Sequence, residues 1–588
     1  MTKVVIRQEK INKYPSKSSL FRPSEAYPEY LFAEDLSKEK NEIYSMIRES
    51  LAMMGLDVDN YGSPLWNPLG ELIKPGDYVL IKPNLVLDSN ASGCGVDCLY
   101  TNPSLVAAIV DYTLIALKGE GKIVIGDAPL QECAFDKLID ESGYANMIAY
   151  YASKNIKNIS LVDFRNVKTI MDKELHYLQE KESTKGIDVR IDDASAFAGM
   201  DKGRISNLRI TNYDPRILQR HHDIKKHEYR ISEYVLNADV IINMPKPKTH
   251  RKAGVTISLK NLVGINANKE YLPHHTIGSK EDGGDAYQLS NNYLTFANQI
   301  LDLRNELVHD NDMKLASIAQ SLYQGLLQKG QKECKEKYWE GSWYGNDTIW
   351  RTIKDLNTIL FYANKMGKLE KTVQRKELIV ADMIVSGQKE GPLEPVPIYP
   401  GTIVVGRDPV WFDRVVCSLM GFSYTEIPSL CEYSQEDQYP ISIENDYEIV
   451  SNNPLWDKQR CETILKENSL EFQPTTGWLE KLGNKYIDRI IDHLHEKKIS
   501  QVYIFGAGVG GAFAKQILES NGINISAYID NNKALHGQLV EENIKCISPD
   551  DVPEGAHIII GARDKYTNEL NKQIIEMKCV CEGIINRG

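Results

Sequence analysis

Five short apolar runs, rich in β-branched residues, place the strongest constraint on the fold of this chain. Each ends abruptly in a polar cluster, which is typical of strands buried on both faces of a parallel sheet. Helical patterns lie between them, for example at residues 104–117 and 409–420. The alternation predicts an α/β fold with a mostly parallel sheet. The five runs are residues 77–81, 122–125, 240–243, 377–380 and 402–405.

A long segment, residues 271–371, carries no strand pattern. We expect a mostly helical insertion that caps the sheet edge, with helices near 292–307 and 347–366. The polar stretch after residue 452, which contains Pro454, Pro474 and Gly477, marks a domain boundary. The predicted division is a large α/β domain over residues 1–455, a linker over 456–484 and a small domain over 485–588.

Composition limits the classes of function. The 588 residues carry a net charge of −12, which disfavours general binding of nucleic acid because such binding neutralises phosphates with Lys and Arg. No apolar run reaches the roughly 18 residues of a membrane span, and the first residues lack the apolar stretch of a secretory signal. We expect a cytoplasmic protein. Its 10 cysteines are scattered, so we expect them to be reduced and to hold no iron–sulfur cluster.

A glycine-rich turn stands out in the small domain. An apolar run at residues 501–505 leads into Gly506, Gly508 and Gly511, and a helical pattern at 512–520 follows. Asp530 ends the next predicted strand, residues 524–529. This order predicts a Rossmann-like α/β domain, in which the glycines let a phosphate approach the helix N-terminus and the acidic residue accepts from ribose hydroxyls.

The same segment resembles a known module. The pieces VYIFGAGVGG, AYIDNN and IIIGA between residues 502 and 561 are similar to the N-terminal nucleotide-sugar-binding domain of PglD-type sugar acyltransferases. The resemblance implies a nucleotide or nucleotide-sugar ligand. The hexapeptide-repeat domain of those enzymes is absent, so acyl transfer does not carry over.

Polar clusters follow the predicted strands of the large domain. The carboxyl ends of parallel strands meet at one edge of a sheet, where ligands bind. We therefore expect a single, locally basic crevice for a phosphate or carboxylate, in which carboxylates could hold Mg²⁺ or another hard cation. Its predicted residues are Lys82, Asn84, Asp127, Lys246, Lys248, His250, Asp382 and Asp408.

Residues 79–422 also resemble the uncharacterised DUF362 family. The matching pieces include VLIKPNLV at 79–86, IVIGDAP at 123–129 and INMPKPKTHRKAGVTISLKNLVGI at 242–265. The segment WYGNDTIWRTIKDLN at 343–357 is similar to a subgroup associated with polysaccharide clusters. Within these pieces, Lys260, Asn261 and Glu390 join the candidate site residues. The ferredoxin-like cysteine cluster that many relatives carry is absent here.

Two functions from different classes stay open. The first is an enzyme acting on a phosphorylated or nucleotide-linked sugar, where the lysines bind phosphate and His250 is the acid/base candidate. Asn84 and Asn261 would line the same site, and Asp127, Asp382, Glu390 and Asp408 would position the cation. The second is a non-catalytic sensor or scaffold. Homo-oligomerisation is open in both.

Overall fold

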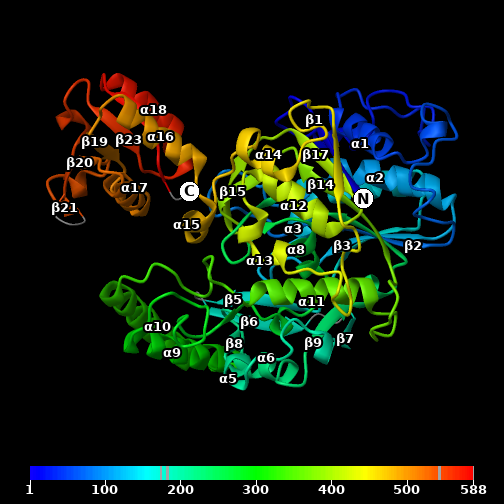
Figure 1. Ribbon diagram of the computed structural model, residues 1–588, viewed down its shortest axis with the longest axis horizontal. Coiled ribbons are helices and arrows are strands. Elements are labelled where there is room, and N and C mark those ends of the chain that lie inside the picture. The colour runs from blue at the N-terminus through cyan, green and yellow to red at the C-terminus, as the bar shows by residue number, and fades with distance from the viewer. Residues whose placement is uncertain (173–174, 181–184, 541–543, 587–588) are drawn as a thin grey trace.

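The computed structural model describes residues 1–172, 175–180, 185–540 and 544–586 (Figure 1). The large domain is built on an eight-stranded sheet with the order β18-β1-β17-β14-β10-β2-β3-β4. Neighbours from β14 to β4 are all parallel, which confirms the predicted α/β fold class. The strands are β1 Thr2–Gln8, β2 Tyr78–Pro83, β3 Lys122–Asp127, β4 Ile159–Asp163, β10 Val240–Met244, β14 Lys376–Met383, β17 Thr402–Gly406 and β18 Tyr447–Ser451.

Alternate residues of each strand enter two different hydrophobic cores. In β2, Val79 and Ile81 pack into one core, whereas Leu80 packs into the other. The first core contains α1 (Glu42–Met53) and α2 (Pro103–Leu117); the second contains α11 (Ile349–Tyr362) and α12 (Pro409–Met420). The sheet is thus buried on both faces, as its apolar strands require.

Strand β17 differs from the prediction. It pairs antiparallel with β14, with Ile379 opposite Gly406 and Asp382 opposite Ile403. It also pairs antiparallel with β1, which enters the sheet between β17 and β18. The residues that follow β17 therefore lie at the opposite edge from those that follow β14. The expectation that all five predicted strands end at one edge is wrong for this strand.

A four-stranded sheet with the order β12-β11-β15-β16 stands beyond the ends of β10 and β14. Each of those long strands continues, after a few residues, into a short strand of this second sheet. Lys248 of β11 lies opposite Thr256 and Gly387. This β11–β15 unit was not predicted. Its strands are β11 Lys248–His250, β12 Gly254–Thr256, β15 Ser386–Glu390 and β16 Glu394–Ile398.

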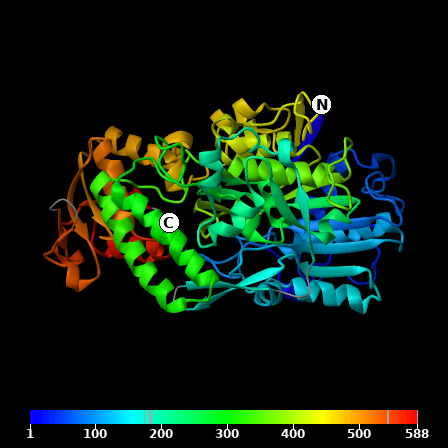
Figure 2. The same ribbon diagram turned by 90° about the horizontal axis from the view of Figure 1, so that it is seen from below.

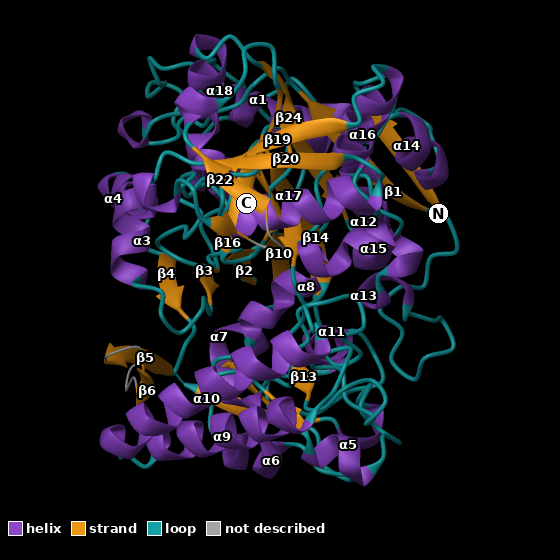
Figure 3. Cartoon of the chain, turned by 90° about the vertical axis from the view of Figure 1, so that its left-hand side faces the viewer, coloured by secondary structure: helices purple, strands orange, loops and turns teal. Residues whose placement is uncertain are grey.

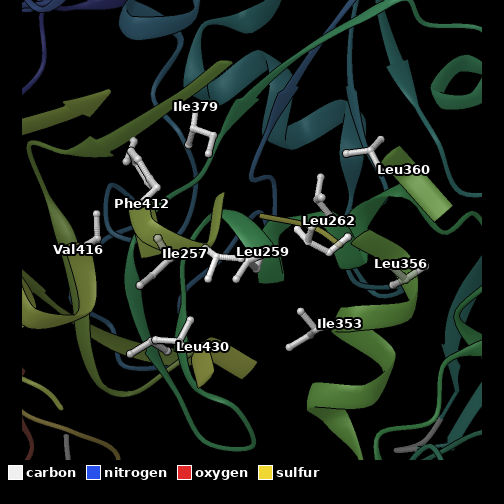
Figure 4. Close-up of a cluster of buried hydrophobic side chains, with 14 of the residues drawn as sticks. Ile257, Leu259, Leu262, Ile353, Leu356, Leu360, Ile379, Phe412, Val416 and Leu430 are labelled. Carbon is white, nitrogen blue, oxygen red and sulfur yellow. The ribbon is translucent and has the colours of Figure 1, made fainter. Parts of the chain in front are cut away.

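The short helix α8 (Ser258–Asn261) lies between β12 and the helices of the second core. Figure 4 shows Leu259 and Leu262 among side chains of α11 and α12, such as Ile353 and Phe412. These apolar contacts fix the segment. The polar residues between the two leucines face the other way.

The insertion contributes three helices of which only the last reaches the large core. Helices α9 (Asn292–His309) and α10 (Met313–Cys334) form a hairpin and lie side by side in Figure 2, whereas α11 packs against α8. The remaining helices of the large domain are α3 Phe135–Ser142, α4 Tyr144–Ser153, α5 Lys202–Ser206, α6 Pro215–His221, α7 Glu233–Leu236 and α13 Pro428–Cys431.

The predicted linker is folded against the large domain. It contains α14 (Cys461–Glu467) and α15 (Leu479–Leu482), and Trp456, Phe472 and Trp478 are buried in the second core. No helix in the described ranges is long and apolar enough to cross a membrane.

The C-terminal body carries a six-stranded sheet with the order β21-β22-β20-β19-β23-β24, parallel except at β21 (Figure 3). Helix α17 begins at Val509, three residues before the predicted start. The elements are α16 Lys485–Glu496, β19 Gln501–Phe505, α17 Val509–Ser520, β20 Asn524–Ile529, β21 Leu539–Val540, β22 Ile544–Ile547, β23 His557–Ile560, α18 Thr567–Glu576 and β24 Val580–Ile584.

Candidate functional site

A cavity of about 120 Å³, which we call the lysine cavity, opens at the carboxyl ends of β2 and β3. It receives side chains from the ends of β2 and β3, from β11, from α8 and from the loop after α8. Its volume is that of a few water molecules or a single small anion. The polar residues that line it are Asn84, Asp127, Lys248, His250, Thr256, Lys260, Asn261, Lys269 and His274.

Helix α8 is held in place by a carboxylate from α12. Asp413 accepts hydrogen bonds from the backbone N–H groups of Ser258 (2.9 Å) and Leu259 (3.0 Å). Together with the buried leucines on the core side, these bonds orient Lys260 and Asn261 toward the lysine cavity.

Asn261 connects the strand ends. Its Oδ1 accepts from Lys82 Nζ (3.2 Å) and from Asn84 Nδ2 (2.9 Å), and its Nδ2 donates to Asn243 Oδ1 (2.8 Å). Asn84 Oδ1 in turn accepts from Lys248 Nζ at 2.5 Å. Buried networks of this kind fix side chains in one arrangement when every member is satisfied.

Two of the predicted lysines are neutralised by carboxylates behind the cavity wall. Lys82 Nζ lies 2.7 Å from Asp127 Oδ1, and burial lowers the pKa of Lys82. Lys246 Nζ lies 3.0 Å from Asp382 Oδ2, which also accepts from the Asn102 N–H. Both pairs are almost fully buried, so removing one partner would leave an isolated charge.

Three other lysines have no such neutralising partner. Lys248 donates to Asn84 and to the Leu99 carbonyl, and Lys269 donates to the Ala128 carbonyl at 2.8 Å. Lys260 makes no hydrogen bond or ion pair with any residue of the described ranges. Burial lowers the pKa of Lys248 well below its usual value, that of Lys260 to about 8 and that of Lys269 to about 7.

His250 is held as a neutral imidazole. Its Nδ1 accepts from the backbone N–H groups of Lys252 and Ala253, both at 3.1 Å, so the proton of the neutral ring is on Nε2. Burial, followed by the charge of Lys260, lowers the pKa of His250 well below its ordinary value. The ring can donate a hydrogen bond into the cavity but is a weak base.

The four carboxylates expected to hold a cation do not come together. Asp127 and Asp382 pair with lysines, and Glu390 Oε1 accepts from the Thr476 N–H at 2.8 Å. Asp408 caps α12, where it accepts from the N–H groups of Val410 and Trp411. Because β17 is antiparallel, this cap lies away from the cavity. Within the described ranges, no three His, Cys, Asp or Glu side chains are placed to share a metal ion.

A larger pocket of about 800 Å³, which we call the interdomain pocket, lies between the C-terminal body and the large domain. One wall is the glycine-rich turn with Asp530 and the loop after β23. The other wall contains Arg251 and the β15–β16 turn. The wall residues from the C-terminal body include Gly506, Gly508, Val509, Gly510, Asp530, Asn531, Arg563 and Tyr566.

The three predicted glycines have different roles. Gly506 has a φ of +113°, and a Cβ on Gly511 would lie 1.9 Å from the Gly506 carbonyl oxygen, so the turn and the close packing of α17 both require glycine. A Cβ on Gly508 would meet nothing within 4 Å, because this residue faces the pocket. Asp530 accepts from the Ala507 N–H at 3.0 Å and from the Asn532 N–H at 2.8 Å.

The large domain is an α/β domain with a cavity at the carboxyl ends of two parallel strands of its sheet. The chain belongs to the family described as "Domain of unknown function (DUF362)", which matches residues 79–192 and 198–418. All the residues of the lysine cavity fall within these two ranges. The C-terminal body lies outside them.

A curated relative is the "Thylakoid-associated protein sll1697" of Synechocystis sp. (strain ATCC 27184 / PCC 6803 / Kazusa), which is 25% identical over 213 residues. The alignment covers 36% of this chain and 46% of the relative, so the two proteins share less than half of the relative's length.

Lys269 and Arg251 are among the residues of these sites that were not predicted. Lys269 follows no strand, and it reaches the cavity from the loop after α8. Arg251 is adjacent to His250, but it lines the other pocket. Neither position carries a local sequence signal, because both depend on how β11 and α8 pack in three dimensions.

Proposed function

We propose that this protein is an enzyme acting on an anionic small metabolite, a phosphorylated or nucleotide-linked sugar, and that the anionic group binds in the lysine cavity. The observation that carries the proposal is a set of three lysines, the buried Lys248 and Lys269 and the half-buried Lys260, which make no ion pair with any carboxylate of the described residues. A role in cell-surface polysaccharide synthesis, which the resemblance of residues 343–357 implies, belongs to the same proposal.

The argument is electrostatic. At an effective dielectric constant of about 20, two like charges about 4 Å apart repel by about 4 kcal/mol. Crowding ammonium groups around an empty cavity therefore costs stability, and a bound anion offsets that cost. Lys260, which has no partner in the described part of the chain, and the Nε2–H of His250 would both donate to the anion.

The second part of the proposal concerns the C-terminal body, which we regard as a Rossmann-like module for a nucleotide or nucleotide-sugar, similar to the N-terminal domain of PglD-type enzymes. In support, Gly508 and the first residues of α17 face the interdomain pocket, and Asp530 ends β20 on the same wall. Backbone N–H groups at a helix N-terminus favour phosphate.

A non-catalytic sensor is the second candidate. It is favoured by His250, whose neutral ring is a poor proton acceptor. Turnover separates the two candidates. The full-length protein would be incubated with nucleoside diphosphate sugars and Mg²⁺, and products would be followed by mass spectrometry. New products support the enzyme; tight binding without any conversion supports the sensor.

The anion site is tested by Lys260→Met, with sulfate as the probe in calorimetry. We expect the variant to bind sulfate at least tenfold more weakly at pH 7. The matched control is Lys225→Met at an exposed position, which should bind like wild type.

Because burial lowers the pKa of Lys260, its charge costs stability below pH 8 and this cost disappears as the pH rises toward 10.4, the ordinary lysine value. Lys260→Met should therefore be more stable than wild type at pH 7, by roughly 1–3 kcal/mol. Unchanged sulfate binding together with a lower melting temperature would contradict the proposal.

A further inference from the structure

The interdomain pocket has a second wall that the glycine-rich turn does not explain. This wall comes from the large domain and consists of Arg251, which follows β11, and the turn that joins β15 and β16. The Arg251 N–H donates to the Gly391 carbonyl at 2.9 Å, so the two segments are joined directly. The Arg251 carbonyl accepts from Trp478 Nε1 at 3.0 Å. The backbone of Arg251 is therefore fixed on both sides.

The guanidinium of Arg251 is available for a ligand. The side chain makes no hydrogen bond or ion pair with any residue of the described ranges, although the residue is partly buried. Glu390 lines the same pocket, but within the described ranges its carboxylate makes no ion pair with Arg251, and its Oε1 accepts from the Thr476 N–H. Arg563, on the wall formed by the C-terminal body, is exposed, and its side chain likewise makes no hydrogen bond or ion pair within the described part of the chain.

The facing wall supplies a second group of donors. Gly508 is the N-cap of the 12-residue helix α17 and offers no side chain to its free N–H groups. Gly508, Val509 and Gly510 all line the pocket. A cationic side chain and a helix N-terminus that face one volume of about 800 Å³ suit a ligand with more than one negative charge.

We propose that the interdomain pocket is a bipartite site for a nucleoside diphosphate group, in which Arg251 and the N-terminus of α17 bind the diphosphate from opposite sides. The inference rests on the proposed function and deepens it, because it names the group recognised and adds a specificity-determining residue from the large domain. A fork-shaped guanidinium binds two oxygens of one phosphate at once. With Arg251 on one phosphate and the N-terminus of α17 on the other, the two walls together favour a diphosphate over a monophosphate.

The two walls are connected by a buried ion pair. Lys389, at the end of β15, places its Nζ 2.9 Å from Asp564 Oδ2 of the C-terminal body and 2.5 Å from Asn586 Oδ1. The Lys389 and Asp564 side chains are only 7% and 17% exposed. This pair joins β15, which leads into the turn beside Arg251, to the C-terminal body.

The test measures binding of UDP, UMP and uridine to the full-length protein by calorimetry. We expect Arg251→Gln to weaken UDP binding by at least tenfold, UMP less, and to leave uridine unchanged. Gly508→Val, which fills the open space in front of α17, should weaken UDP as well. Arg407→Gln is the matched control, because Arg407 is exposed and outside the pocket.

The outcomes separate the inference from the proposed function. If Gly508→Val loses UDP while Arg251→Gln binds it like wild type, the C-terminal body holds the ligand alone and the bipartite site is wrong. If Arg251→Gln weakens UDP and UMP equally, selectivity for the diphosphate is wrong. If the wild-type protein binds neither UDP nor ADP, the nucleotide-binding proposal fails, and the inference fails with it.

Discussion

Lys260 and Lys248 show how two lysines of one cavity can differ in character. Lys248 is bound on two sides by protein oxygens, so its ammonium group is part of the fold. Lys260 has no hydrogen-bond or ion-pair partner among the residues that the structure describes, and it borders the cavity. A lysine that borders the cavity as Lys260 does is the one expected to contact a ligand, although Lys248 and Lys260 look alike in the sequence.

The lowered pKa values predict how anion binding changes with pH. Sulfate stays dianionic, and it binds the protonated forms of Lys260 and Lys269, whose pKa values lie at about 8 and about 7 in the free protein. As the pH rises from 6 to 9 these lysines lose protons, so sulfate affinity should fall by roughly ten- to a hundredfold. Other charged or titratable groups at the cavity are Lys82, Asp127, Lys248, His250 and His274.

The measurement is calorimetry at several pH values. Burial keeps His250 and His274 neutral across this range, because it lowers both of their pKa values, that of His274 to about 3. In Lys260→Met, sulfate binding should be coupled to about one proton fewer than in wild type, so the affinity should change less with pH. An affinity that rises with pH would mean that the lysines do not bind the anion in their charged form.

At the scale of elements, the direction of a strand decides which polar residues meet. Asp382 and Asp408 both follow apolar runs and look equivalent in the sequence. Since β17 is antiparallel to β14, only Asp382 is brought to the carboxyl edge of the parallel strands. Composition and length do not specify strand direction, so this error could not be avoided from the residues alone.

Asp408→Ala tests the role that the structure gives to this residue. Loss of the N-cap of α12 should lower stability by about 1 kcal/mol. Sulfate and UDP binding should remain as in wild type. Thermal unfolding measures the change in stability, and calorimetry measures ligand binding. A loss of ligand binding without a loss of stability would show that Asp408 belongs to the ligand site.

Long elements with strong local signals were predicted well. The predicted bounds of α12 and β20 coincide with those of the structure. This is because Asp408-Pro409 marks the start of α12, and Gly522 and Asp530 lie on either side of β20. The β11–β15 unit was missed, since β11 and β12 have only three residues each and β15 has no apolar run. The convergence of Lys82, Asn84 and Asp127 followed from parallel strand ends, whereas Lys269 and Arg251 depended on tertiary packing.

At the scale of the whole molecule, the ion pair between Lys389 and Asp564 joins the two bodies. We predict that Asp564→Lys weakens UDP binding severalfold, because two facing lysines would separate the walls of the interdomain pocket. The double variant with Lys389→Asp should recover part of the affinity. Calorimetry on the single and double variants measures this coupling. Equal UDP affinity in wild type and Asp564→Lys would show that the pair does not position the walls.

Strand β1 also has a consequence for how the protein is made. Residues 2–8 lie between β17 and β18, so both of their partners are more than 390 residues away along the chain. During synthesis, at about 5–20 residues per second, this strand waits at least about 20 seconds for its partners. Val4 and Ile6, on the face that packs against α12, are uncovered during that time, whereas Val5, on the other face, packs in the core that contains α1. The ribosome-bound chain is therefore a candidate client for chaperones at its very first strand.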